Sequence, residues 1–197
     1  MKSDVIFISN DGKHMEEALA LPDKVAVYKE LKHKDALHLR LLTEELLGMM
    51  RSITGERMGC FWIEDHDKLF RLHLQVDTPM DFDKEEKLLA ASTSGKNEAA
   101  KGIMGRIRAF FDPIDWGNAP YSMSVSSPMN TNTIDPGFTW SMNSYRDAVK
   151  EDMENHEEGA AEAWDELEKS VVSNIADDVK VSIRGRKVEM VIELRVS

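Results

Sequence analysis

The sequence predicts an α/β two-layer sandwich, in which a mostly antiparallel sheet is covered on one face by helices. Two observations point to this fold class. Residues 60–76 and 178–195 each have the pattern of a β-hairpin, and residues 37–54 carry an apolar stripe at helical spacing. Alternate residues of a strand share one face, as do helix residues three or four apart, so both kinds of element need a common core.

The N-terminal segment predicts one strand followed by short helices. Residues 4–9 (DVIFIS) form a β-rich run that ends at the turn signal of residues 10–12. Residues 14–20 predict a brief helix. Pro22 suits the first turn of a second helix, which reaches about residue 32.

A longer helix is expected next, with Asp35 as its N-cap. Gly55 stands where a helix commonly stops. The apolar residues follow one another at spacings of three and four, which indicates one buried face. This stripe consists of Leu39, Leu42, Leu46, Met49 and Ile53.

The first hairpin is predicted from strands at residues 60–63 and 69–76, joined by a polar turn at residues 64–68. In the second strand, apolar residues alternate with Arg71, His73 and Gln75. The apolar set is therefore expected to face the core. It consists of Phe70, Leu72, Leu74 and Val76.

The middle of the chain predicts a short helix at residues 83–91 and another from Asn97 to Phe111. Gly102 and Gly105 interrupt the second helix at a cost of about 1 kcal/mol each relative to Ala, which indicates a close approach to the backbone. Residues 112–137 are rich in Pro, Ser, Asn and Met without a sustained period, and are expected to be irregular.

Residues 144–175 predict one long acidic helix, and residues 178–195 a closing hairpin with its turn at 184–187. Between Arg146 and Lys169 the sequence holds ten acids and three bases, so most of the excess negative charge is local. The expected buried stripe of the helix is Ala148, Met153, Ala160, Trp164, Leu167, Val171 and Ile175.

Length and charge limit the function classes. The 197 residues fit one domain, residues 1–197, with an insertion at about residues 112–177. The net charge of -11 disfavours nucleic acid and anionic membranes as partners. Cys60 is the only cysteine, and there is neither a long apolar run nor a signal-peptide pattern, so a cytoplasmic location is expected. The oligomeric state stays open.

The order of the expected elements resembles that of the histidine-kinase-like (GHKL) ATPases, in particular the anti-sigma-factor serine kinases and sensor-kinase ATP-binding domains. The likeness covers about residues 4–111 and 178–196. In that family a glutamate of the long helix activates the nucleophile, and an asparagine four residues later holds Mg²⁺. The resemblance makes Glu44 the catalytic base, with Gly48 at the asparagine's place; one residue on, Glu45 and Met49 take these places.

The resemblance also implies a nucleotide site for ATP and Mg²⁺. Asp77, after the hairpin, corresponds to the aspartate that reads adenine, although Pro79 and Asp81 stand where the family has glycines. The segment KGIMGRI corresponds to the helix start under the phosphates, where free amides favour anions. Its implied binding residues are Lys101, Gly102 and Gly105. The lid over the nucleotide would be residues 78–101.

Each of these residues also has a purely structural interpretation. Glu44 and Glu45 suit the exposed flank of an amphipathic helix, Asp77 suits a strand end, and the two glycines suit close helix–sheet packing. The six histidines form no ligand set, so no metal site is expected from protein side chains alone.

Two functions therefore stay open. One is an ATP-binding regulatory domain, with phosphotransfer to a partner protein as its enzymatic version. The other is a non-catalytic module that keeps the fold and binds a protein through residues 112–175. An unrelated sandwich with no nucleotide site is a third interpretation. The Met and aromatic residues of 116–142 predict either a partner surface or packing over the sheet.

Overall fold

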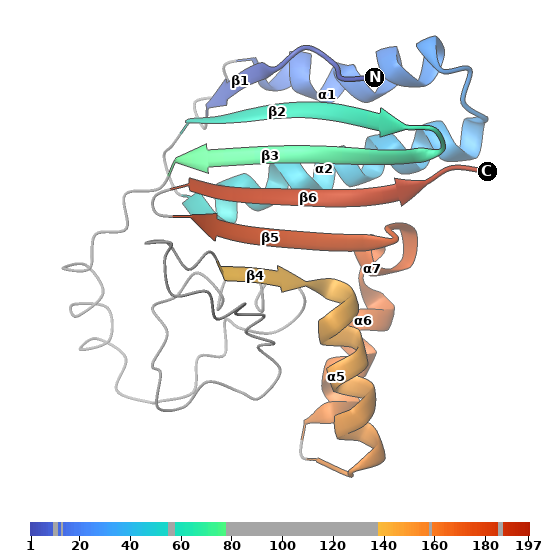
Figure 1. Cartoon of the computed structure of the whole chain (residues 1–197), viewed down its shortest axis with the longest axis vertical. Helices are drawn as coiled ribbons and strands as arrows, with labels where there is room; N and C mark the ends of the chain where they lie inside the picture. The colour runs from blue at the N-terminus through green and yellow to red at the C-terminus, as the bar shows by residue number, and fades with distance from the viewer. Residues whose placement is uncertain (10–11, 13, 55–57, 78–137, 158, 185–186) are drawn as a thin grey trace, which may run out of the picture.

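The computed structural model describes residues 1–9, 12, 14–54, 58–77, 138–157, 159–184 and 187–197. Within these residues, six strands form one sheet in the order β1-β2-β3-β6-β5-β4, and all neighbours are antiparallel. Helices α1 and α2 cover one face of this sheet (Figure 1). The architecture is a two-layer α+β sandwich, as the sequence predicts.

The strands are β1 (Ile6–Ser9), β2 (Met58–His66), β3 (Leu69–Asp77), β4 (Phe138–Ser141), β5 (Asp178–Arg184) and β6 (Lys187–Arg195). The described helices are α1 (Met15–Tyr28), α2 (His33–Thr54), α5 (Met142–Glu154), α6 (Ala160–Lys169) and α7 (Val171–Ile175).

The first predicted hairpin is confirmed as β2 and β3. All four apolar residues that were expected to face the core are at most 1% exposed, namely Phe70, Leu72, Leu74 and Val76. The turn is tighter than expected, because Glu64 still pairs with Arg71 in the ladder. Asp67 has a φ of 59°, which lets the chain reverse next to Lys68.

The predicted stripe of α2 is also confirmed where its side chains are described: Leu39, Leu42, Leu46 and Met49 are fully buried. They pack on the apolar face of the two central strands. The closing hairpin is confirmed as β5 and β6, and β6 pairs with β3 along its whole length. The core thus joins the two hairpins, which are far apart in the sequence.

The prediction of two helices in residues 14–32 is wrong, because α1 is one helix with Pro22 inside it. Proline removes a single backbone hydrogen bond; here its ring is buried with the core. The helix ends at Tyr28 because Glu30 takes a left-handed conformation with a φ of 52°. Leu31 N then donates to Ala26 O at 3.0 Å, which is the closing bond of a Schellman motif.

The prediction that Asp35 caps α2 is wrong as well. The helix begins two residues earlier, at His33, and the Asp35 side chain is buried. Its Oδ2 accepts hydrogen bonds from the Ser197 hydroxyl at 2.8 Å and the Ser197 N–H at 3.3 Å. Asp35 therefore holds the end of the described chain against α2.

The single helix expected at residues 144–175 is in fact the three helices α5, α6 and α7. The first break follows from two left-handed residues, His156 with a φ of 59° and Gly159 with a φ of 84°. The second break occurs at Ser170, whose side chain accepts a hydrogen bond from Ser173 N and caps α7. The stripe changes accordingly: Met153 and Val171 are exposed, whereas Leu167 is buried.

Part of the predicted insertion is built into the sheet. β4 pairs with β5 at one edge, and α5 and α6 extend beyond that edge (Figure 1). Trp140 and Met142 are 8% and 0% exposed, so these two residues pack in the core and are not a partner surface.

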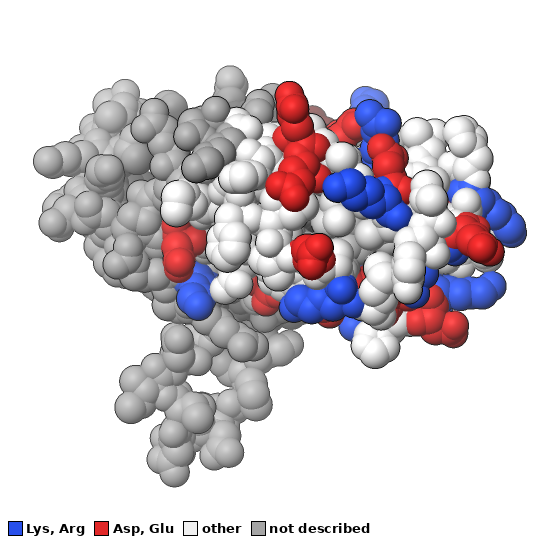
Figure 2. All heavy atoms as spheres, turned by 90° about the horizontal axis from the view of Figure 1, so that it is seen from above, with Lys and Arg blue, Asp and Glu red and all other residues white. Residues whose placement is uncertain are grey.

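The expected helices at residues 83–91 and 97–111 and the irregular segment at residues 112–137 lie outside the described residues, as does Gly55. No helix in the described ranges is long and apolar enough to span a membrane. Acidic and basic side chains are interspersed on the side where α1 and β1 face the viewer (Figure 2).

Candidate functional site

The two glutamates in the middle of α2 both point to solvent. Glu44 and Glu45 are exposed, on the side of the helix opposite its buried stripe. The Nε of Arg40, one turn earlier, donates to Glu44 Oε1 at 3.1 Å. Arg40 also lies 3.6 Å from Asp23 of α1. Glu44 thus belongs to an exposed ion-pair group between two helices.

Asp77 is the last residue of β3 and is exposed. Within the described part of the chain, no hydrogen bond or ion pair engages its carboxylate. Its negative charge acts on Cys60. The pKa of the Cys60 thiol is raised by burial first and by the Asp77 carboxylate second, and Lys187 offsets part of this rise. As far as the described residues go, the Asp77 carboxylate can accept hydrogen bonds from a ligand.

The C-terminal half of α2 lies close to the end of the sheet that carries Asp77. A Cβ added to Gly59 would lie 3.2 Å from Met50 Sδ and 3.3 Å from Val76 Cγ1. Any larger residue would force its neighbours to move, because the helix and the strands approach closely at Gly59. By strand alternation, however, Asp77 shares its face with Gln75, whereas α2 covers the other face. The described residues therefore do not bring Glu44 and Asp77 onto one surface.

The remaining predicted binding residues, Lys101, Gly102 and Gly105, lie outside the described residues. Gly48 and Met49 stand where the two possible alignments put the family's metal-binding asparagine. Gly48 is exposed on α2, and Met49 is buried. Among the described residues, no group of three His, Cys, Asp or Glu side chains is arranged to hold a metal ion.

The face of the sheet opposite α1 and α2 (Figure 1) carries a cluster that the sequence patterns did not single out. His73 of β3 stacks on Trp62 of β2, with 4.7 Å between ring centroids and 7° between planes. The Trp62 indole N–H donates to Glu64 Oε1 at 2.9 Å. This hydrogen bond first, and then the nearby Lys2 and His73, hold the pKa of Glu64 below its usual value. The sequence feature that could have indicated this cluster is the alternation of polar and apolar residues in β3, which places His73 on the face away from the core.

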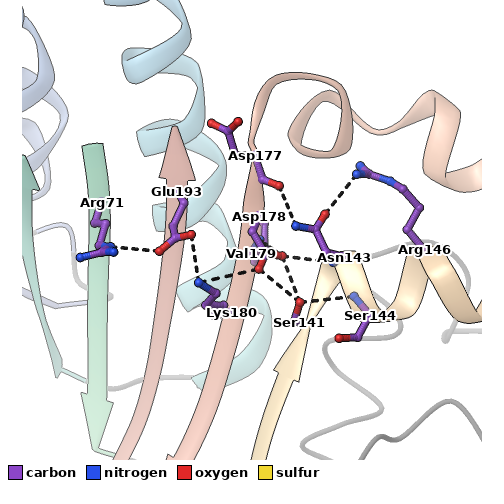
Figure 3. A network of polar contacts seen from close by, with 10 residues as sticks. All are labelled: Arg71, Ser141, Asn143, Ser144, Arg146, Asp177, Asp178, Val179, Lys180 and Glu193. Carbon is purple, nitrogen blue, oxygen red and sulfur yellow. Dashed lines mark hydrogen bonds and ion pairs between the residues drawn. The ribbon is translucent and has the colours of Figure 1, made fainter. Parts of the chain in front are cut away.

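A second polar group crosses the same face (Figure 3). Glu193 of β6 accepts from Arg71 Nε at 2.9 Å and lies 2.9 Å from Lys180 Nζ. Burial alone would raise the pKa of Glu193, but Lys180 and Arg71 outweigh it and lower the pKa. Lys180 is also 3.9 Å from Asp178. Because these charges neutralise one another, the group suits a solvated sheet surface.

Comparisons with protein-family models, curated proteins and solved structures find no match to this chain.

Proposed function

We propose that the chain is an ATP-binding regulatory domain in which Asp77 reads the adenine amino group. The observation that carries this proposal is the exposed carboxylate of Asp77 at the end of the central strand β3, which no hydrogen bond or ion pair engages within the described residues. A free carboxylate accepts hydrogen bonds from an amino group, which is the chemistry that adenine recognition needs. The resemblance to the histidine-kinase-like ATPases supports the same role.

Calorimetric titration with ATP, with and without Mg²⁺, tests this proposal. We expect binding that weakens by at least tenfold in Asp77→Asn, since the amide cannot accept as strongly as a carboxylate. Asp67→Asn, in the turn at the other end of β3, is the matched control and should bind ATP like the parent chain. Absence of heat at millimolar ATP, or equal affinity in Asp77→Asn, would overturn the proposal.

The enzymatic version adds phosphotransfer to a partner protein, with Glu44 as base. A general base must be able to reach the proton that it takes, and Glu44 would have to leave Arg40 to do so. Glu44→Gln should then retain ATP binding and lose transfer of labelled phosphate, whereas Glu45→Gln should keep both. Undiminished transfer in Glu44→Gln would remove Glu44 from the mechanism.

The second candidate is a non-catalytic protein-interaction module. Two observations favour it. Glu44, the expected base, is engaged in an ion pair with Arg40. The acidic helices α5 and α6 extend from the edge of the sheet (Figure 1). A partner with a basic surface would complement this charge.

This candidate is best tested by surface substitution, because deletion of residues 112–175 would remove β4 and expose the edge of β5. Glu151→Lys with Glu162→Lys should weaken binding of a lysine- and arginine-rich peptide and reduce its salt dependence. Glu16→Lys with Glu17→Lys, on exposed positions of α1, is the matched control. Equal loss in both double variants would show binding to net charge alone.

A further inference from the structure

His73 lies in the middle of β3 on the face of the sheet opposite α1 and α2, where it contacts both neighbouring strands. Its Nδ1 is 3.1 Å from Glu189 Oε1 on β6. Its Nε2 is 3.7 Å from Glu64 Oε2 on β2. The ring is stacked on Trp62, and only 12% of the His73 side chain is exposed. One imidazole is therefore held between two carboxylates.

The two ring nitrogens of His73 are not equally satisfied. At 3.1 Å, Nδ1 is within hydrogen-bond range of Glu189, whereas the buried Nε2 has no hydrogen-bond partner among the described residues. A neutral imidazole has a single N–H, so it can donate to only one of the two carboxylates. An imidazolium has two N–H groups and can donate to both.

We propose that protonation of His73 completes a hydrogen-bonded crosslink between β2, β3 and β6. In the neutral state, Nδ1–H donates a hydrogen bond to Glu189, and Nε2 makes no hydrogen bond to the described residues. Uptake of one proton creates Nε2–H, and a shift of the Glu64 carboxylate by a few tenths of an ångström closes the second hydrogen bond. Histidine is the side chain whose charge ordinarily changes between about pH 5 and 8, so pH is the natural variable with which to test this crosslink.

The other partners of Glu64 bind its Oε1, so Oε2 is the oxygen that faces the His73 ring. Lys2 Nζ and the Trp62 indole N–H both engage Glu64 Oε1, at 3.1 Å and 2.9 Å. Lys2 also lies over the Trp62 ring, 4.7 Å from its centroid. Two carboxylates and one ammonium surround His73, so proton uptake changes the charge of the cluster from about -1 to about zero.

The other charges on this face do not compete for the ring. Arg71, two residues before His73 on β3, pairs with Glu193, and Lys180 of β5 pairs with Glu193 too. Val191, an apolar residue, is directly opposite His73 on β6. Protonation of His73 is thus coupled to Glu64 and Glu189, and it changes both the charge of the cluster and the hydrogen bonds between the strands.

Fluorine NMR of the full chain labelled with 5-fluorotryptophan tests the crosslink, because the four tryptophans give separate probes. Trp62→Phe assigns the resonance of Trp62. We expect this resonance to shift between pH 5 and pH 8 in one step, together with the imidazole signals of His73. The shift should disappear in His73→Gln and persist in His66→Gln, which alters an exposed histidine of the same hairpin. A Trp62 resonance that stays constant over this range would overturn the proposal.

A second variant separates the crosslink from a ring that merely titrates in place. Glu64→Gln keeps the shape of the side chain and removes the charge that favours Nε2–H, so the Trp62 transition should move to lower pH. The parent chain and Glu64→Gln suffice for this comparison if His73→Gln fails to fold. An unmoved transition in folded Glu64→Gln would show that Glu64 takes no part, and would refute the crosslink.

Discussion

The carboxylate of Asp178, at the start of β5, accepts a hydrogen bond from the Ser141 hydroxyl at the end of β4, with 3.2 Å to each oxygen. The same carboxylate accepts from Asn143 N at 3.1 Å and from its own strand at Val179 N, at 2.9 Å (Figure 3). The side chain is only 9% exposed. One buried carboxylate thus joins the edge strand, the first turn of α5 and β5.

Asp178→Ala should lower the free energy of unfolding by about 2–3 kcal/mol, because hydrogen bonds to a charged group are lost and buried donors stay unsatisfied. Urea denaturation followed by circular dichroism measures this change. Asp147→Ala, at an exposed position of α5, is the control and should change stability by no more than about 0.5 kcal/mol. Equal stability of the two variants would contradict the anchoring role of Asp178.

Gly59→Ala should destabilise the fold by about 1–3 kcal/mol, the usual effect of overpacking. The added Cβ would meet Gln75 O at 3.1 Å, and this backbone atom of the neighbouring strand cannot move away freely. Thermal unfolding of the variant provides the measurement. An unchanged melting temperature would show that β2 and α2 are less closely packed than the structure has them.

Gly48→Ala should have the opposite effect and stabilise the protein by about 1 kcal/mol, because alanine favours the helix interior more than glycine does. Apart from the backbone of α2 itself, no atom of the described residues lies within 4 Å of the added Cβ on this exposed side of the helix. The same thermal assay checks the gain. A loss of stability would indicate that something contacts Gly48 there.

Asp65 should contribute to acid sensitivity. Burial alone would raise its pKa, but Lys29 Nζ at 2.8 Å and the Met1 ammonium at 3.0 Å outweigh burial, so the folded-state pKa is lowered. The pKa in the unfolded chain is about 3.9, so the unfolded chain binds the proton more tightly than the folded chain does. The stability from Asp65 is therefore complete above that pH and is lost as the pH falls through the folded-state pKa.

Denaturant titrations between pH 2 and pH 6 measure this dependence. Asp65→Asn should be less stable than the parent at neutral pH and should lose less stability on acidification. Asp67→Asn, exposed in the adjacent turn, should follow the parent curve. Parallel curves for Asp65→Asn and the parent would exclude the ion pairs as the cause.

Leu46→Ala should cost about 2–5 kcal/mol, because Leu46 is fully buried between α2 and the sheet and its removal leaves a cavity. Leu37→Ala is a matched control on the same helix, since Leu37 is 47% exposed. Urea denaturation of both variants should show a large loss only for Leu46. Similar losses would mean that α2 does not pack on the sheet through this stripe.

Local patterns were sufficient to predict the elements that pack on the core. The alternation from Phe70 to Val76 and the stripe from Leu39 to Met49 each depend only on geometry within one element. Local patterns were misleading where a helix ends without a glycine or proline at its C-terminus. His156 and Glu30 take left-handed conformations, which are uncommon for residues other than glycine, so the ends of α5 and α1 could not be predicted from composition.

The candidate site was predictable only in part. The exposed positions of Glu44 and Asp77 agree with an amphipathic helix and with a strand end, but their separation on two sides of the sheet depends on how α2 packs. His73 and Glu189 are distant in the sequence, and neither carries a motif. Their contact exists because β3 pairs with β6.

The sequence by itself determined the two hairpins, the buried faces of β3 and α2, and the fold class that follows from them, because side-chain periodicity is a local property of the backbone. Only the tertiary structure decided the pairing of β3 with β6 and the partners of Asp35, Asp65, His73 and Asp178. Except for Val179, which follows Asp178 in β5, these partners lie in other segments of the chain. Such contacts form when burial of the shared apolar core brings these elements together, and no local pattern encodes them.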